Sequence, residues 1–289
     1  MVDVRHEFAL SNGSARFAVA GNSDRGAVRK LNEDSFLARL PVSVVADGMG
    51  GHAFGDRASQ AAVAVFASRF GDMELARPQD VLDTVRRAND AVLQVSRESD
   101  TPGALSGTTL AGVALVELEP SGFGWMVFNV GDSRVYTWDD SSLSQVSKDH
   151  SAVQEMVDAG EITREESERH PDRNVVTRAL GATQDVRTDS WILPATGHQT
   201  FLVCSDGLTK ELDDDEIAGL IAQGAGEPVS AIAERLVTAA VAAGGADNVT
   251  VVMVEADFET DPDEDTVERP DARDQGASLE MLDDTLPRR

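Results

Sequence analysis

Apolar residues occur in short runs through most of the chain, and polar or turn-forming residues bound each run. The runs are rich in Val, Leu and Phe and are bounded by Gly, Asp or Asn, which is typical of strands. This pattern predicts strands at Phe17–Ala20, Ser35–Leu40, Val42–Ala46, Thr108–Glu117, Trp125–Val130, Arg134–Trp138, Thr200–Cys204 and Asn248–Glu255.

Three longer segments repeat their apolar residues with the period of a helix. In Arg57–Phe70 the apolar side chains fall on one stripe, as they do in Gln79–Ser96. Val229–Ala243 shows the same spacing, with Pro228 before it and two glycines after it, as helix boundaries commonly have. We predict a helix at each segment.

The order of these elements argues for a fold class. Strands come first, followed by two helices, several more strands, mixed elements, two helices and a last strand. This is not the regular alternation of a doubly wound sheet, so we predict an α+β fold with largely antiparallel sheets. Ser133 and Ser205 lack the Gly-x-Ser-x-Gly surroundings of a hydrolase nucleophile.

Acidic residues dominate the C-terminal end. Residues 257–289 hold 12 Asp and Glu against 4 Arg, a net charge of 4 − 12 = −8, with three prolines and little apolar periodicity. Such a composition buries too little apolar surface to fold. We therefore predict one folded domain over residues 1–257 and an acidic disordered tail over residues 258–289.

The overall charge excludes several kinds of partner. The formal net charge is 25 − 51 = −26, which argues against broad nucleic-acid binding and against anionic membranes. The single cysteine excludes an internal disulfide, and no run is long enough to span a membrane. No signal peptide is recognisable at the start. We expect a cytoplasmic monomer.

Four apolar runs end in an aspartate that is followed by a small residue or Asn. These aspartates are Asp47, Asp132, Asp206 and Asp247. A single aspartate after a strand would be interpreted as a turn former. Four aspartates that each follow an apolar run suggest that their carboxylates meet at one edge of the sheets. Carboxylates at one rim repel each other unless cations bind between them, and all-oxygen ligands suit Mg²⁺ or Mn²⁺ better than zinc.

Further polar groups flank these aspartates. Asn32, Glu33 and Asp34 follow Arg29 and open a predicted strand, and a Ser-Gly-Thr-Thr segment opens another. A divalent-metal site beside an arginine favours phosphate chemistry, because the metals and the guanidinium can share the phosphoryl oxygens.

Eight motifs resemble, in order, those of the metal-dependent protein serine/threonine phosphatases of the PP2C (PPM) family, and especially its compact bacterial members. They are RKLNEDSF, VVADGMGGHAFGDRAS, SGTTL, NVGDSRVY, KDHS, TRALG, FLVCSDGLTKEL and DNVTVV. The resemblance implies a four-layer αββα sandwich, in which two antiparallel sheets pack face to face and helices cover the outer faces. It also implies a metal centre at one end of the sandwich.

The resemblance implies a set of metal ligands. Asp47 matches the aspartate that bridges two metals, and Gly48 matches the residue that supplies a backbone carbonyl. Asp206 and Asp247 match the remaining ligands of the first metal. Asp132 matches the residue that, with Asp206, holds a weaker third metal. The implied cofactors are Mn²⁺ or Mg²⁺ in two tight sites and a third weaker one.

It also implies roles for residues around the metals. Asp34 matches a carboxylate that orders metal-bound water, and Arg29 matches the arginine that receives the substrate phosphate. His52 follows the DGMGG motif, where a proton donor, a structural role and a substrate contact are all open. Residues 149–180 correspond to a mobile flap beside the site. Cys204 is interpreted as a buried core residue.

The implied activity is hydrolysis of phosphoserine and phosphothreonine in proteins by a metal-bridging hydroxide, without a phosphoenzyme. The implied partners are a bacterial Ser/Thr kinase and its substrates. Two alternatives remain: a two-metal phosphodiesterase or nuclease, which the missing basic groove disfavours, and a non-catalytic phosphoprotein-binding scaffold, which the complete ligand set disfavours.

Overall fold

The computed structural model describes residues 2–10, 13–50, 54–71, 75–98, 106–118 and 122–260. Two six-stranded sheets form its centre, and the strands in both pair antiparallel. None of the helices in these ranges is both long and apolar enough to cross a membrane.

The first sheet has the spatial order β1-β2-β12-β11-β8-β9. Its strands are β1 (Val2–Leu10), β2 (Gly13–Asp24), β12 (Val249–Thr260), β11 (His198–Cys204), β8 (Arg134–Trp138) and β9 (Leu143–Gln145). The second has the order β10-β7-β6-β4-β3, with β5 beside β4. Its strands are β10 (Asp189–Pro194), β7 (Phe123–Val130), β6 (Leu110–Glu117), β4 (Val42–Gly50), β3 (Asp34–Leu37) and β5 (Ser106–Thr108).

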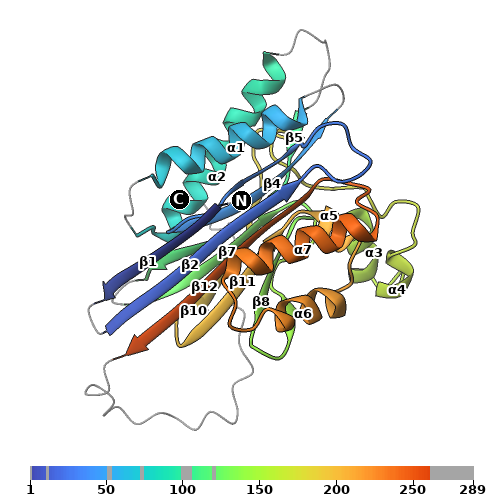
Figure 1. Ribbon diagram of the computed structural model, residues 1–289. Coiled ribbons are helices and arrows are strands. Elements are labelled where there is room, and N and C mark those ends of the chain that lie inside the picture. Colours follow the sequence, from blue (N-terminus) through green and yellow to red (C-terminus); the bar gives the residue numbers. More distant parts are fainter. Residues whose placement is uncertain are drawn as a thin grey trace.

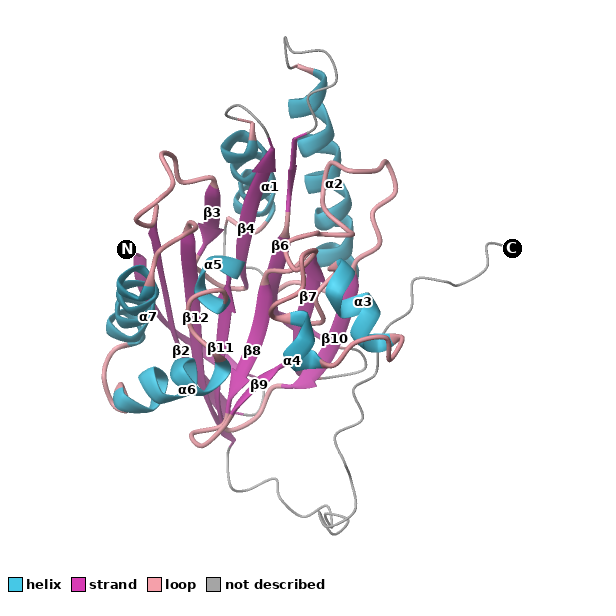
Figure 2. Ribbon diagram, turned by 90° about the vertical axis from the view of Figure 1, so that its right-hand side faces the viewer, coloured by secondary structure: helices cyan, strands magenta, loops and turns pink. Residues whose placement is uncertain are grey.

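Helices cover the outer faces of both sheets (Figure 1). On the second sheet lie α1 (Gly55–Arg69) and α2 (Pro78–Arg97), and on the first lie α6 (Asp214–Gln223) and α7 (Val229–Ala243). Three short helices, α3 (Ala152–Asp158), α4 (Arg164–Ser167) and α5 (Asp206–Thr209), lie at the right-hand side in Figure 1 and so face the viewer in Figure 2. The four-layer αββα arrangement is therefore confirmed.

Alternating side chains of each strand enter two different cores. On β4, Val44 packs toward α1 and α2, whereas Val45 packs between the sheets. On β6, Ala114 faces the helices and Leu115 the other sheet. Because both faces of each sheet are covered, the strands read as continuous apolar runs instead of alternating apolar and polar residues. This explains why the apolar runs were readily recognised.

The predicted strands and helices are all present; Arg134–Trp138 and Val229–Ala243 have the predicted ends, and the others have shifted ends. The run Thr108–Glu117 is interrupted, because β5 ends at Thr108 and β6 begins at Leu110. Several elements were not predicted, namely β1, β9, β10 and α3 to α6. Most of these are short or polar, so their apolar pattern is weak.

The last strand extends three residues past the boundary predicted after residue 257. Strand β12 continues to Thr260 and pairs with β2 along its whole length. The ring of Phe258 lies 5.6 Å from that of Phe17 and 6.3 Å from that of Trp125. Phe258 therefore belongs to the folded domain. The rest of the predicted tail, residues 261–289, lies outside the described residues.

Candidate metal centre

A buried carboxylate, Asp34, and a half-buried one, Asp47, face each other at the start of β3. Asp34 on β3 is directly opposite Asp47 on β4 in the antiparallel register. Ser205, which precedes α5, donates its hydroxyl to Asp34 Oδ2 at 2.8 Å, and the Thr250 N–H donates to Ser205 Oγ at 2.9 Å. These bonds join the first sheet to the second at Asp34.

The interruption between β5 and β6 holds Asp47. Thr109 sits in the gap, where its N–H donates to Asp47 O at 2.9 Å and its hydroxyl accepts the Asp47 N–H at 2.9 Å. The same hydroxyl lies 2.7 Å from Ser133 Oγ, next to Asp132. A chain of bonds thus connects the backbone of Asp47 to the turn that carries Asp132.

His150 fixes that turn from the other side. Its ring nitrogen Nδ1 accepts the Gly131 backbone N–H at 2.9 Å, and the backbone N–H of His150 donates to Gly131 O at 2.9 Å. Because Nδ1 is an acceptor, the proton lies on Nε2, which is 3.1 Å from Asp189 Oδ2. Gly131 has a φ of 110°, and a Cβ there would lie 2.7 Å from Thr109. Only glycine fits this turn.

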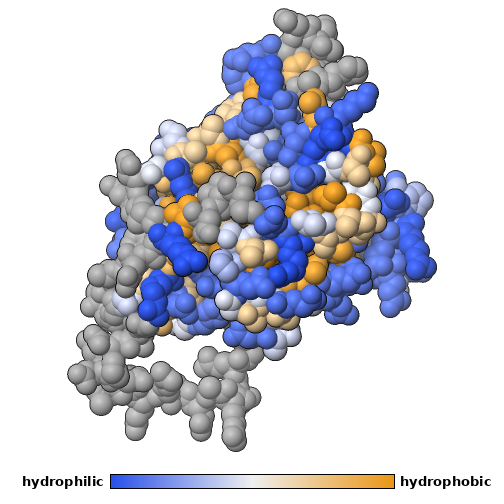
Figure 3. Space-filling model, in the orientation of Figure 1, coloured by the Kyte–Doolittle hydropathy of each residue, from blue (hydrophilic) through white to orange (hydrophobic). Residues whose placement is uncertain are grey.

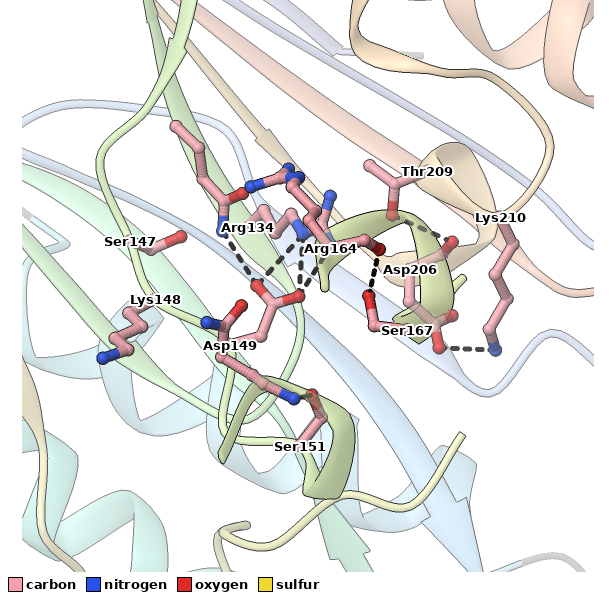
Figure 4. Close-up of polar contacts among 12 residues, drawn as sticks. Arg134, Ser147, Lys148, Asp149, Ser151, Arg164, Ser167, Asp206, Thr209 and Lys210 are labelled. Atoms are coloured by element: carbon pink, nitrogen blue, oxygen red, sulfur yellow. Dashed lines mark hydrogen bonds and ion pairs between the residues drawn. The ribbon is translucent and has the colours of Figure 1, made fainter. Parts of the chain in front are cut away.

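Asp206 and Asp247 both contact the ammonium group of Lys210, the residue that follows α5. Lys210 Nζ lies 2.5 Å from Asp206 Oδ2 (Figure 4). The same nitrogen lies 3.1 Å from Asp247 Oδ2. Arg29 Nη2 reaches the same Asp247 oxygen at 2.9 Å. Asp247 therefore joins an exposed arginine to the buried carboxylates.

Glycine at position 48 is required by close packing. A Cβ there would lie 2.1 Å from Gly55 O and 2.5 Å from Glu33 O. The backbone next to Asp47 is consequently pressed against the start of α1. Any larger residue would push α1 away from the carboxylates.

The electrostatics confirm that these acids crowd one another. Burial, helped by the nearby Asp206 and Asp247, raises the pKa of Asp34 to about 7, although hydrogen bonds lower it. Burial also raises the pKa of Asp132 to about 7, with Asp206 and Asp149 adding to the effect. The pKa of Asp47 lies well above its usual range, because of burial and four neighbouring aspartates.

The donor set fits a hard divalent cation. Asp34 Oδ1 and Asp206 Oδ1 are buried without a hydrogen-bond partner, which a cation would correct. The available ligands are carboxylate and carbonyl oxygens, as Mg²⁺ and Mn²⁺ prefer. Among the described residues, no three acidic, His or Cys side chains already surround a single point. Ion binding would therefore require the carboxylates to move closer together and the Lys210 ammonium to leave its place between Asp206 and Asp247.

The structure brings together most of the predicted site residues. Asp34, Asp47, Gly48, Asp132, Asp206, Asp247 and Arg29 lie at one end of the sandwich, linked by the contacts above. His52 lies outside the described residues. Cys204 is fully buried, and burial raises the pKa of its thiol to about 12, so its predicted core position is confirmed.

Sequence reasoning missed several supporting residues. Lys210 directly follows α5 and is four positions after Asp206, a spacing at which side chains meet, and this was the available signal. His150 and Asn248 lie in quoted motifs, but only the fold shows what they contact. Asn248 donates to Arg25 O and Leu31 O at 2.9 Å and accepts the Glu33 N–H at 2.8 Å.

The predicted flap segment, residues 149–180, has two short helices and well-anchored ends. Asp149 pairs with Arg134 through three bonds of 2.7–3.0 Å (Figure 4). At the other end, Arg178 donates to Asp189 Oδ1 at 2.6 Å. The flap's ends are therefore tied to β8 and β10, and its mobility stays a prediction.

Known proteins resemble this chain over most of its length. The family profile described as Protein phosphatase 2C matches residues 23–243. The serine/threonine phosphatase stp of Listeria monocytogenes is 34% identical over 247 residues, covering 82% of this chain and 94% of that protein. PstP of Mycobacterium tuberculosis is 39% identical over 238 residues, covering 82% of this chain and 44% of PstP.

Solved structures agree with the fold. The PstP catalytic domain in complex with two manganese ions has a TM-score of 0.71 and 35% identity, over 84% of this chain and 99% of that one. The PPM phosphatase MsPP of Mycobacterium smegmatis, in complex with cacodylate, has a TM-score of 0.71 and 35% identity, over 82% and 97%.

Proposed function

Because this chain belongs to the protein phosphatase 2C family, and is a metal-dependent protein serine/threonine phosphatase of bacterial type, we propose that its crowded aspartates hold the catalytic metals. The observation that carries this proposal is the pair of buried, unpartnered oxygens on Asp34 and Asp206 among acids with raised pKa values. Buried acids with strongly raised pKa values oppose folding, and such clusters are typical of functional sites.

The proposed ligands follow from position. Asp47, Asp206 and Asp247, together with the Gly48 carbonyl, would hold two ions. Asp132 and Asp206 would hold a third, weaker ion, in line with the pKa of Asp132, which the nearby Asp206 carboxylate helps to raise. When bound, Mn²⁺ or Mg²⁺ supplies Lewis acidity, which acidifies water and offsets charge on phosphoryl oxygens.

The remaining residues orient the reactants. Arg29 is exposed at the rim and binds the substrate phosphate, which its five-donor guanidinium suits. Asp34 Oδ2 accepts a hydrogen bond from the Ser205 hydroxyl, whereas Asp34 Oδ1 has no hydrogen-bond partner and can orient the attacking water. His52 is kept as a candidate proton donor or substrate contact.

The third site has its own test. Asp132→Ala should keep two tight Mn²⁺ sites in calorimetry while losing most of kcat on phosphopeptides, because few protein ligands hold the weaker ion. A variant that keeps full kcat, or that also loses the tight sites, would contradict this role.

The substrates are phosphorylated Ser and Thr residues of proteins, and the proposed physiological partners are a bacterial Ser/Thr kinase and its targets. The protein with Mn²⁺ should hydrolyse phosphothreonine peptides and p-nitrophenyl phosphate but not bis-p-nitrophenyl phosphate, a diester. Preference for the diester would indicate the phosphodiesterase alternative, and binding without turnover would indicate the scaffold.

Arg29→Ala separates phosphate binding from metal binding. We expect a higher KM for phosphopeptides with almost unchanged Mn²⁺ affinity, because the guanidinium grips the substrate in its ground state. A collapse of metal binding would instead make Arg29 a structural partner of Asp247.

A further inference from the structure

The loop between β2 and β3 is held rigidly against the turn that carries Asp247. Asn248 donates from its amide nitrogen to both Arg25 O and Leu31 O at 2.9 Å, closing the loop at its two ends. The Ala27 N–H donates to Gly245 O at 2.8 Å. Gly26 has a φ of 76°, and a Cβ there would lie 2.1 Å from Asp247 O. The loop therefore presents residues 27–31 in one defined conformation.

This rigid loop exposes apolar side chains. Four large apolar side chains are exposed in the part of the chain that the structure describes, and two of them are Val28, at 68%, and Leu31, at 53%. They flank Arg29, the proposed phosphate-binding residue. Figure 3 shows hydrophobic surface interrupting the hydrophilic surface on the side where this loop lies. A polar side chain would serve solubility better at both positions, so their exposure suggests a partner.

The charge of the loop narrows the choice of partner. Arg25, Arg29 and Lys30 are exposed cations in a chain of net charge −26. Arg25 and Lys30 form no ion pair with any residue that the structure describes. An anionic ligand with apolar neighbours complements this surface, and a phosphorylated peptide segment has that chemistry.

We propose that Val28 and Leu31 form a docking surface for phosphoprotein substrates, one that takes an apolar side chain close to the phosphorylated residue. The proposal rests on the proposed phosphatase function, because it places the phosphate on Arg29. An extended peptide advances about 3.3 Å per residue, so the contacted side chain lies within about three residues of the phosphate. The loop thereby selects among phosphopeptides.

The variants for the test keep the loop's shape. Val28→Thr replaces one methyl by a hydroxyl, and Leu31→Gln keeps a similar length, so the double variant removes apolar character with little change in volume. Both side chains are exposed, and Val28 and Leu31 take part in the hydrogen bonds of the loop only through their backbone N–H and C=O groups. The matched control is Leu75→Gln, an exposed apolar residue, at 37%, beside Ala76, which pairs with Val116 near the far end of β6.

The substrates are two phosphothreonine peptides that differ only in having Leu or Gln on both sides of the phosphothreonine, with p-nitrophenyl phosphate as a small reference. The wild type should favour the Leu peptide by roughly tenfold in kcat/KM, mainly through KM. In the double variant this preference should fall to about twofold or less, and the kcat/KM ratio of Leu peptide to p-nitrophenyl phosphate should fall with it. Leu75→Gln should keep both ratios.

Other results would overturn the proposal. A wild type that hydrolyses both peptides equally, or a double variant that keeps the preference, removes the docking role and leaves the phosphatase function intact. A loss of p-nitrophenyl phosphate turnover equal to the loss on the Leu peptide makes the loop part of the catalytic centre instead. Failure of the wild type on every phosphomonoester would refute the proposed function itself.

Discussion

The space between the two sheets and the carboxylate end of the same sheets are both shielded from water, but their side chains differ in kind. Between the sheets, Trp125 and Phe201 are fully buried with ring centroids 5.0 Å apart. At the carboxylate end, Asp34 and Asp132 are buried beside other aspartates, and burial raises both pKa values to about 7. The first region stabilises the fold and the second opposes it. Stability and function are therefore located in adjacent but separate parts of one sandwich.

Asp206→Asn should produce the largest effect on activity. Asn keeps the shape but removes the charge that holds a cation, so phosphatase turnover with saturating Mn²⁺ should fall at least about 1,000-fold, or about 4 kcal/mol. Melting in a chelator should stay at or above the wild-type temperature, because one of several crowded charges is gone. Asp215→Asn, at an exposed position on α6, is the control. Wild-type activity in Asp206→Asn would refute the metal assignment.

Phe201→Ala should produce the opposite result. Removing a fully buried ring between the sheets should lower the free energy of unfolding by about 3–4 kcal/mol, measured by urea denaturation. Activity per folded molecule should stay close to wild type at a temperature where the variant is folded. If turnover collapses while stability is kept, the two regions are not separate.

The pH dependence of stability tests the carboxylate end directly. The folded pKa values of Asp34 and Asp132 are raised above the unfolded value of 3.8 to about 7. Between these values the folded protein binds more protons than the unfolded chain, so stability in a chelator should fall as pH rises from about 4 to 7. Asp34→Asn should flatten this slope. A melting temperature that rises steadily over the same interval would contradict the raised pKa values.

Two truncations compare the end of β12, residues 258–260, with the rest of the predicted tail, residues 261–289. A chain ending at residue 257 loses Phe258 and its ring contacts, which should cost about 1–3 kcal/mol in thermal or urea unfolding. A chain ending at residue 260 should match the full-length protein, because residues 261–289 have little apolar surface to bury. Equal stability of both truncations would show that Phe258 adds nothing to the core.

Lys210→Met should produce the smallest effect and should act only at the carboxylate end. The ammonium partly neutralises Asp206 and Asp247 but also repels a divalent cation there. Without it, the rise in melting temperature on adding Mn²⁺ should increase by about 2–4 °C, equivalent to about 1 kcal/mol for this partly exposed group. Glu155→Gln, on α3, is a control that changes charge elsewhere. A smaller rise than in the wild type would mean that Lys210 supports ion binding.

Much of the fold could be predicted because each apolar run is buried on both faces. The runs at β4, β6 and β11 are therefore continuous, and the helices α1, α2 and α7 show clear periodicity. The α+β class followed from their order, whereas the two-sheet arrangement came from resemblance to a family. Short or polar elements such as β9 and α4 were missed, since their position depends on contacts distant in the chain.

The candidate site was predicted in part for a similar reason. Most of the aspartates follow apolar runs that predict strands, so the sequence alone indicated which aspartates lie at strand ends. Asp47 was placed at a strand end, but β4 continues to Gly50, and Thr109 holds it from a gap that no local pattern reveals. The contacts of His150 with Gly131, and of Asn248 with two carbonyls of the β2–β3 loop, also depend on three-dimensional proximity.

The sequence by itself determined the long apolar strands and helices, the acids that follow those strands, and the large excess of negative charge. Local steric and hydrophobic preferences act over a few residues, so they are visible in the order of residues alone. Only the tertiary structure decided that Asp34 faces Asp47, that Lys210 lies between Asp206 and Asp247, and that Phe258 completes the core. Except for Lys210 and Asp206, which are four positions apart, those contacts join residues from 13 to more than 200 positions apart. Burial gives them their energy only once both sheets have packed.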